Sequence, residues 1–277
     1  MLRALAAQGI DPAEVVWDDP AVDWAAYDVV VVRSTWDYFE RRDDFLAWAE
    51  RVATVSALHN PVSVLRWNSD KRYLLDLARR GVPIVPTMFV EPRAMAALPP
   101  DERDLIVKPA VSAGSNDTAR YGAGEREAAL AHVARLQAEG RVAMVQPYQR
   151  GVDEHGETAL LYFDGRFSHA IRKGAIFAAG PQMVGGLFAR EEIHPREPSA
   201  AELAVGDAAL RGAAEALPAD AMPLLYARVD LVPLADGGPG VLELELCEPS
   251  VFVAHADGAA DRLAAAIARR VEVRLAP

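Results

Sequence analysis

Carboxylates gather on two strand-like segments near the C-terminal end of the chain. Residues 228–232 (RVDLV) and 241–246 (VLELEL) alternate between polar and apolar side chains, and residues 236–240 (DGGPG) between them have the composition of a tight turn. Side chains two residues apart share one face of a strand, so the spacing predicts a hairpin with a charged face and an apolar face. The charged face would carry Arg228, Asp230, Glu243 and Glu245.

Three carboxylates on one face need a compensating group, because bringing them together costs Coulomb repulsion and desolvation. Mg²⁺ prefers oxygen ligands and commonly binds a few carboxylates together with phosphate oxygens. Asp230, Glu243 and Glu245 are therefore candidate Mg²⁺ ligands. An antiparallel ribbon with one face in water has the same pattern, and this segment alone does not decide between the two interpretations.

Candidate phosphate-binding groups lie upstream of the hairpin. Lys108 ends a predicted strand and precedes a loop of small residues, whose backbone N–H groups can approach an anion closely. The loop lacks the spacing of a P-loop. Lys71 falls in the first turn of a helix predicted over residues 69–80, where the helix N-terminus would attract an anion, although Lys71 taken alone is a surface lysine. The loop residues of interest are Ser112, Gly114 and Ser115.

Two segments between these groups and the acidic hairpin also carry candidate ligand contacts. Residues 142–148 form a predicted strand that stops at a proline, and main-chain groups of Gln146, Pro147 and Tyr148 are candidates to bind an adenine edge. Residues 157–173 predict a hairpin that turns at Asp164-Gly165. It ends in Arg172 and Lys173, which fit either an anion site or a solvated strand end, followed by a glycine-containing stretch predicted to be mobile (Gly174, Gly180, Gly185 and Gly186).

The N-terminal part has the pattern of a parallel sheet. A helix ending at Gly9 precedes a strand expected at residues 14–17, and residues 28–32 form a continuous β-branched run. Doubly wound domains normally begin with a strand, and none is predicted before the helix. Residues just past a parallel strand commonly line a ligand crevice. Arg33, Ser34 and Asp37 are thus candidate substrate contacts or, equally, parts of a capped loop before the next helix.

Composition narrows the class of protein. The chain has 277 residues, of which 51% are hydrophobic, and a net charge of −11 that disfavours nucleic acid and anionic membranes as partners and favours a small ligand. We expect no membrane span and no export signal. The single cysteine, Cys247, permits no internal disulfide, which suits the cytoplasm, and we interpret it as a small buried residue in preference to a nucleophile. The sequence is compatible with a homo-oligomer.

The order of these motifs resembles that of the ATP-grasp ligases, from about residue 60 to the end of the chain: two lysines, a small-residue loop, Gln-Pro-Tyr, an Arg-Lys hairpin and an acidic hairpin. The resemblance implies a mixed α/β (α+β) ATP-grasp fold. A doubly wound parallel-sheet domain that lacks its first strand would occupy residues 1–66, and the ATP-grasp domain residues 67–277. Within the latter, residues 67–148 would carry the nucleotide lysines and the hinge, and residues 149–277 the metal site.

The resemblance also implies cofactors and roles, namely ATP and Mg²⁺ bound by this chain's own residues. Lys71 and Lys108 would hold the phosphates under the loop of Ser112, Gly114 and Ser115. The adenine hinge would be Gln146, Pro147 and Tyr148, and Glu157 would accept the ribose hydroxyls. Asp230, Glu243 and Glu245 would bind Mg²⁺, and Arg172, Lys173 and Arg228 would act on the transferred phosphoryl group. The family usually ends the metal motif Glu-x-Asn; here Glu245 replaces the amide, and Glu248 and Ser250 become candidate substrate contacts.

Four strings resemble a bacterial subgroup that includes the cycloserine-forming cyclo-ligase, which closes O-ureido-serine onto its own carboxylate: WDDP (17–20), RSTWDY (33–38), FSHAIRK (167–173) and ELELCEPS (243–250). This implies an ATP-dependent ligase that activates a carboxylate of an amino-acid-like substrate as an acyl phosphate for attack by a nitrogen nucleophile. The alternatives are an intermolecular carboxylate–amine ligase and a nucleotide-binding protein without ligase activity. We expect Asp230→Asn or Glu243→Gln to abolish ADP formation and leave the fold intact.

Overall fold

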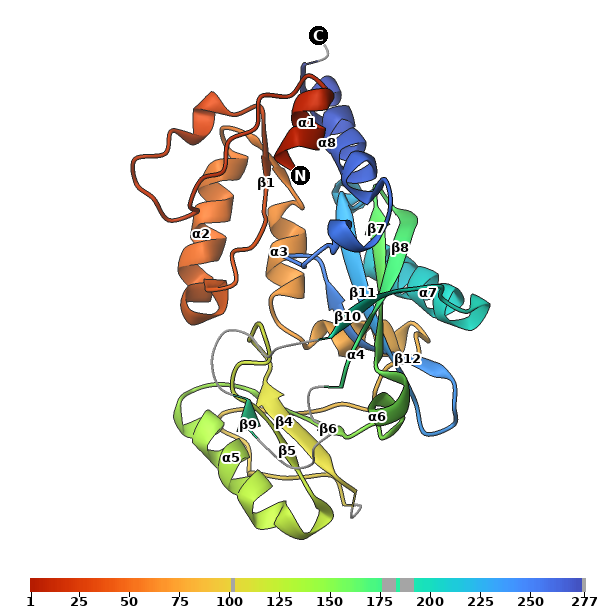
Figure 1. Cartoon of the computed structure of the whole chain (residues 1–277). Coiled ribbons are helices and arrows are strands. Elements are labelled where there is room, and N and C mark those ends of the chain that lie inside the picture. Colours follow the sequence, from red (N-terminus) through yellow and green to blue (C-terminus); the bar gives the residue numbers. More distant parts are fainter. Residues whose placement is uncertain (101–102, 176–182, 185–191, 276–277) are drawn as a thin grey trace.

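The computed structural model describes residues 1–100, 103–175, 183–184 and 192–275 (Figure 1). The described residues form one parallel pair of strands and two five-stranded antiparallel sheets, with helices packed against them. The mixed α and β fold predicted from the sequence is confirmed.

The N-terminal part is built around the parallel pair, in which Val30 of β1 lies beside Leu58 of β2. The run at 28–32 is thus a strand at its centre, whereas the strand expected at 14–17 is absent: this segment is irregular and Val16 is 63% exposed, because no strand pairs with it. The elements are α1 (Leu2–Ala7), β1 (Val29–Val31), α2 (Arg42–Ala53) and β2 (Ala57–His59).

The first five-stranded sheet has the order β3-β6-β4-β5-β9. One face is covered by α5, whose Ala129, Val133 and Leu136 pack with the strand residues Val107 and Val145 (Figure 1). The predicted strand, loop, helix and strand between residues 104 and 148 are confirmed, and the sequence did not reveal β3 or β5. The elements are β3 (Met88–Val90), β4 (Leu105–Pro109), β5 (Thr118–Tyr121), α5 (Arg126–Ala138), β6 (Ala143–Pro147) and β9 (Met183–Val184).

The second five-stranded sheet has the order β10-β8-β7-β11-β12 and contains both predicted hairpins. Strand alternation separates its two faces: Leu160 and Tyr162 pack in the core that includes α7, whereas Leu161 and Phe163 pack in the core that includes α8. The elements are α6 (Gly151–His155), β7 (Glu157–Phe163), β8 (Arg166–Lys173), β10 (Ile193–Arg196), α7 (Ala200–Ala216), β11 (Tyr226–Pro233), β12 (Pro239–Glu245) and α8 (Ala259–Leu275).

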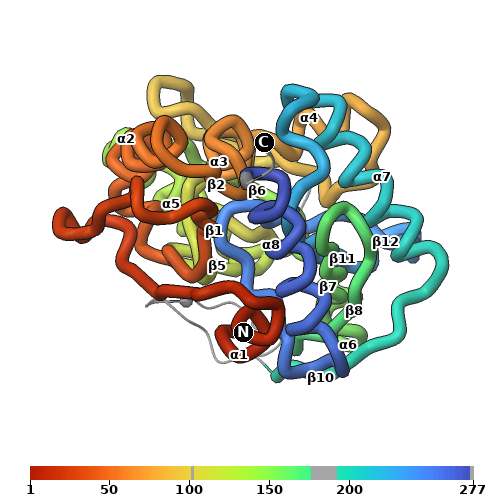
Figure 2. Tube along the Cα trace, turned by 90° about the horizontal axis from the view of Figure 1, so that it is seen from above, coloured from red at the N-terminus to blue at the C-terminus, as the bar shows by residue number. Residues whose placement is uncertain are grey.

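Helix α1 joins the N-terminal part to the second sheet. Leu5 packs in the same core as Leu263 and Ile267 of α8, and the two helices lie side by side in both views (Figures 1 and 2). Burial of these side chains stabilises the contact by roughly 1.5–3 kcal/mol each.

The helix predicted over residues 69–80 is wrong at its N-terminal end. Instead, α3 (Val62–Asn68) and α4 (Tyr73–Arg79) are separated by a turn that contains Lys71. Asn68 causes the break, because its side-chain amide donates to the carbonyl of Leu244 at 2.7 Å and accepts from the N–H of Leu246 at 2.7 Å. The Asp70 carboxylate then accepts from the N–H of Arg72, as in an Asx-turn. The proposed domain boundary at residue 66 falls inside α3 and stays a prediction.

Candidate active site

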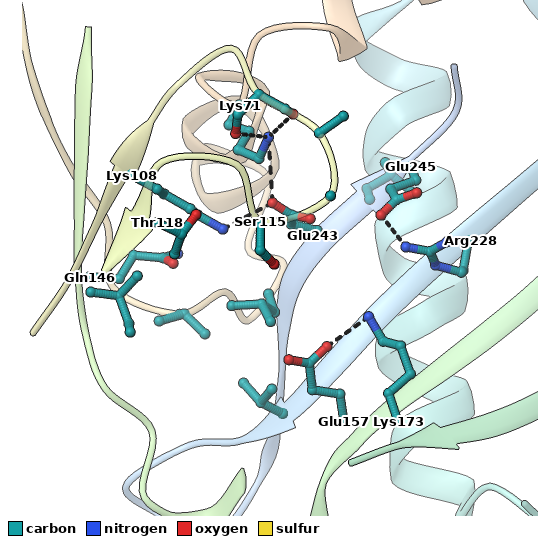
Figure 3. A pocket seen from close by; sticks show the side chains of 18 of the residues that line it. Lys71, Lys108, Ser115, Thr118, Gln146, Glu157, Lys173, Arg228, Glu243 and Glu245 are labelled. Carbon is teal, nitrogen blue, oxygen red and sulfur yellow. Dashed lines mark hydrogen bonds and ion pairs between the residues drawn. The ribbon is translucent and has the colours of Figure 1, made fainter. Parts of the chain in front are cut away.

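A cavity of about 240 Å³ lies between the two five-stranded sheets (Figure 3). Three parts of the chain line it: the segment after β1, the turn between α3 and α4, and the facing strands and loops of the two sheets. The charged side chains that line it are Lys71, Lys108, Glu157, Lys173, Arg228, Glu243, Glu245 and Glu248. Cations from both sheets therefore face a group of carboxylates on the second sheet.

The acidic hairpin presents its carboxylates in register. Arg228 of β11 lies opposite Glu245 of β12, and Asp230 lies opposite Glu243, so the four side chains form two cross-strand pairs. One ligand oxygen each from Asp230, Glu243 and Glu245 lies within 4.8 Å of the others. The solvated-ribbon interpretation is wrong for this face, because Asp230 is 1% exposed and Arg228 is 6% exposed.

Asp230 is held by two cations. Its carboxylate accepts from Arg228 Nε at 2.8 Å and from Lys173 Nζ at 2.8 Å. Burial by itself would raise the pKa of Asp230, but Arg228 and Lys173 outweigh it and hold that pKa below its usual range. Lys173 Nζ also lies 2.8 Å from Glu157 Oε2 (Figure 3). Lys173 thereby links the predicted ribose contact to the predicted metal ligands.

Glu243 joins the second sheet to the phosphate-binding side. Lys108 Nζ donates to Glu243 Oε1 at 2.9 Å, and Lys71 Nζ lies 3.6 Å from the same oxygen. Burial raises the pKa of Glu243, whereas the two lysines lower it by more, so it falls below its usual range. Lys71 Nζ also donates to the carbonyl of Ser112 at 2.7 Å. The two lysines thus converge on Glu243 from separate elements, and Lys71 also contacts the small-residue loop.

Glu245 and Glu248 differ from these two acids. Burial raises the pKa of Glu245 to about 7, helped by the negative charges of Asp230 and Glu243 and opposed by Arg228. Burial followed by repulsion from Glu245 raises the pKa of Glu248 to about 8. Asp230, Glu243 and Glu245 bring ligand oxygens within 4.8 Å of one another, and the charges of the first two help raise the pKa of Glu245. A bound divalent cation would relieve that repulsion, so these three residues fit Mg²⁺.

The other end of the cavity is apolar and meets the predicted hinge. The apolar lining there comprises Val85, Ile106, Val232, Leu242 and Leu244. The predicted hinge residues Gln146, Pro147 and Tyr148 also line the cavity. A planar heterocycle fits between such walls.

Part of the hinge is already used within the protein. The N–H of Tyr148 donates to the carbonyl of Asp104 at 2.8 Å, and the side-chain amide of Gln146 donates to Thr87 at 2.9 Å. We predicted that the Tyr148 N–H would bind an adenine edge, but it is already bonded to Asp104.

A family model described as the N-terminal domain of D-cycloserine synthetase DcsG matches residues 1–60. The chain is 43% identical over 281 residues to the cycloserine biosynthesis protein DcsG of Streptomyces lavendulae, covering 98% of this chain and 93% of that protein. The chain belongs to the D-cycloserine synthetase family of ATP-grasp ligases. It is therefore a ligase that forms C–N bonds, as the motif order predicted.

Solved structures agree on the fold. The crystal structure of D-cycloserine synthetase DcsG matches with a TM-score of 0.87 at 42% identity, covering 98% of this chain and 93% of that one. The ATP-grasp ligase PsnB with its minimal precursor matches with a TM-score of 0.61 at 19% identity, covering 98% and 93%. The D-alanine–D-alanine ligase of Bacillus anthracis matches with a TM-score of 0.60 at 17% identity, covering 87% and 85%. The last two are evidence for the fold alone.

Other structures of these two ligases hold nucleotides: PsnB has been solved with Mg and ADP, and the B. anthracis ligase with ATP. In the present chain, no helix within the described ranges is long and apolar enough to cross a membrane.

Arg172 was predicted to act on the transferred phosphoryl group, but its side chain does not line the cavity. It alternates with Lys173 along β8, so the two side chains point to opposite faces of the strand. The guanidinium of Arg172 donates to the carbonyl oxygens of His155 and Glu154, the latter at 2.9 Å. Lys173 is the member of the pair that lines the site.

The predicted substrate contacts near the N-terminus are split. Asp37 accepts from Trp17 Nε1 at 3.1 Å and from Arg41 at 3.2 Å but does not cap a helix with its side chain, and Ser34 is exposed. Arg33 Nη1 donates to the carbonyl of Pro249 at 2.7 Å, so it positions the segment after β12. None of these three lines the cavity, because the segment turns Trp36 and Tyr38 inward instead.

Sequence reasoning missed several lining residues: Trp36, Tyr38, Asn68, Tyr73, Thr118 and Phe252. Trp36 and Tyr38 flank Asp37. The sequence therefore indicated the right segment after the strand but not which of its side chains face the cavity. Phe252 adopts a left-handed backbone conformation with φ of +44°, and Arg228 lies 5.6 Å from its ring centroid. A non-glycine residue in this conformation has no signal in its sequence.

Two further expectations concern residues beside the site. Cys247 is 2% exposed, and burial raises the pKa of its thiol, which agrees with a small buried residue and disfavours a nucleophile. The mobile stretch expected after Lys173 includes Gly180, Gly185 and Gly186, which lie outside the described residues.

Proposed function

We propose that the chain forms cycloserine by closing O-ureido-serine onto its own carboxylate. The observation that carries this proposal is the 43% identity to DcsG along 93% of that protein, together with cavity residues suited to a nucleotide, Mg²⁺ and an acid. When bound, Mg-ATP supplies the phosphoryl group that activates the substrate carboxylate. Each of the following roles rests on the geometry of this chain's own side chains.

Lys71 and Lys108 hold the nucleotide phosphates. Both ammonium groups point into the space between Glu243 and the loop of Ser112, Gly114 and Ser115 (Figure 3). The apolar walls and the hinge strand receive the base, and Glu157 receives the ribose hydroxyls. A buried, water-poor setting strengthens each of these charge contacts.

Mg²⁺ would be held by Asp230, Glu243 and Glu245. These acids contact Lys108 of the first sheet and Lys173 and Arg228 of the second. Glu245 stands where the wider family has Asn, and a carboxylate serves equally as an oxygen ligand. Arg228 and Lys173 both contact Asp230 and line the cavity, where they would stabilise negative charge that develops during phosphoryl transfer. We do not assign this role to Arg172.

The test is ADP release by the purified chain with ATP, Mg²⁺ and a panel of amino acids, followed by the mass of the product. Ring closure would join the nitrogen bonded to oxygen to the carboxyl carbon, whose oxygen leaves with phosphate, and hydrolysis would release the carbamoyl group as carbon dioxide and ammonia. The single expected product is therefore lighter than O-ureido-serine by the mass of carbon dioxide and ammonia. A product whose mass is the sum of two substrates less water would instead identify an intermolecular ligase, and nucleotide binding without ADP release under any condition would identify a binding protein.

A further inference from the structure

Glu248 follows β12 and lines the cavity, yet no residue in the described part of the chain holds its carboxylate. The residue is 7% exposed. Its Oε2 atom is buried and has no hydrogen-bond partner, and no ion pair reaches its side chain within the described residues. Burying a carboxylate oxygen without a partner costs free energy, so such a group points to a partner that arrives from outside.

The other carboxylates that line the cavity are satisfied. Glu157 lies 2.8 Å from Lys173 Nζ, Glu243 lies 2.9 Å from Lys108 Nζ, and Glu245 accepts from the guanidinium of Arg228. Glu248 thus differs from the neighbouring carboxylates, because among the described residues it has no cation paired with it. The missing partner is a cation or a strong hydrogen-bond donor.

Glu248 is not part of the candidate metal site, since the carboxylates whose oxygens cluster within 4.8 Å are Asp230, Glu243 and Glu245. Nor does Arg33 serve as its partner: within the described residues no hydrogen bond or ion pair joins its guanidinium to Glu248, and it donates instead to the carbonyl of Pro249 at 2.7 Å. The missing partner is therefore a separate cation or hydrogen-bond donor.

The walls of the cavity favour an organic ammonium group. Trp36, Tyr38 and Phe252 line the same cavity as Glu248, and aromatic faces attract ammonium groups. Ser250, two residues after Glu248, adds a hydroxyl. An α-amino acid brings an ammonium group on the carbon next to the carboxylate that reacts, so both groups enter together.

We propose that Glu248 accepts the α-ammonium group of the substrate and thereby selects amino acids over acids that lack an α-amino group. The inference rests on the proposed ligase reaction and adds the group that recognises its substrate. Glu248 is a binding residue, and its carboxylate takes no part in phosphoryl transfer.

The test is a double-mutant cycle between enzyme and substrate. Wild type and Glu248→Gln are compared by kcat/KM for ADP release with matched pairs: O-ureido-serine, serine and alanine, each against the same acid without its amino group. Because a charge-assisted hydrogen bond is lost, Glu248→Gln should lower kcat/KM for the amino acid by about 10- to 100-fold and change it less than about threefold for the desamino acid. The KM for ATP and the Mg²⁺ dependence should stay the same.

Glu248→Asp is the matched variant, since it keeps the charge and should retain more activity than Glu248→Gln; equal thermal unfolding midpoints of the three proteins show that folding is not the cause. Equal losses on both members of a pair, or an increased Mg²⁺ requirement, would overturn the inference. Turnover of alanine or serine without turnover of O-ureido-serine would refute cycloserine formation. The role of Glu248 would then be tested by comparing that amino acid with its desamino counterpart. Turnover restricted to desamino acids would refute the ammonium subsite itself. Turnover of none of the compounds would refute the proposed ligase reaction, and the inference that rests on it would fall with it.

Discussion

Asp230 and Glu245 are both predicted metal ligands, but they differ in what else depends on them. Asp230 is 1% exposed and compensates two buried cations, Arg228 and Lys173. The side chain of Glu245 is 30% exposed and pairs with Arg228. Asp230→Asn and Glu245→Gln should therefore both impair Mg²⁺-dependent ADP release, while only Asp230→Asn should also destabilise the fold.

The magnitude follows from the charges left behind. Removing one partner of a buried ion pair costs about 3–5 kcal/mol when the remaining charge is left without compensation. After Asp230→Asn, Arg228 keeps Glu245 and Lys173 keeps Glu157, so we expect the lower end of this range, about 3 kcal/mol. In a chain of this size that loss lowers the unfolding midpoint by about 10 °C. Glu245→Gln removes a partly exposed pair and should cost about 1 kcal/mol or less. The expectation from the sequence, that Asp230→Asn leaves the fold intact, thus needs correction.

Thermal unfolding and ADP release as a function of Mg²⁺ concentration measure the two effects separately. Asp236→Asn is the control, since it removes a charge from the exposed turn of the same hairpin, where Asp236 Oδ1 accepts from the Gly238 N–H. It should change neither quantity. An Asp230→Asn protein as stable as wild type would refute the argument from buried charge. An unchanged Mg²⁺ dependence in Glu245→Gln would refute its assignment as a ligand.

Three further predictions follow from single contacts. The pKa of Glu248 is about 8 in the fold against an ordinary 4.5, so the free energy of unfolding should be highest below pH 4.5 and fall as the pH rises through 8. Glu248→Gln should remove this fall, which amounts to at most about 1.4 kcal/mol per pH unit, as measured by denaturant unfolding. Asp117 ties the end of the small-residue loop to Arg135 and, at 2.9 Å, to Arg141, so Asp117→Asn should raise the KM for ATP several-fold more than it lowers kcat. Arg172→Gln should keep near-normal ADP release, because this side chain bonds carbonyl oxygens outside the cavity; a loss of 100-fold or more would restore its predicted catalytic role.

Local chemistry explains why much of the site could be found from the sequence. Alternation and the turn at 236–240 fixed the acidic hairpin, since a strand's side-chain period is independent of its surroundings. The type of residue likewise marked Lys71, Lys108 and the small-residue loop as cation and anion-binding groups. Lys71 was assigned correctly to the cavity from a wrong element, because the helix break at Asn68 depends on strand residues 176 positions away.

Sequence alone therefore determined the hairpins, the ligase family and the inventory of charges, all of which rest on short-range patterns and motif order. Tertiary structure decided which charges meet. It turned Arg172 away and Lys173 inward, because helices cover opposite faces of the second sheet. It also left Glu248 buried beside satisfied acids, with no hydrogen-bond partner for its Oε2 atom among the described residues. Whether a carboxylate is satisfied depends on every group packed around it, and those groups come from segments far apart in the chain.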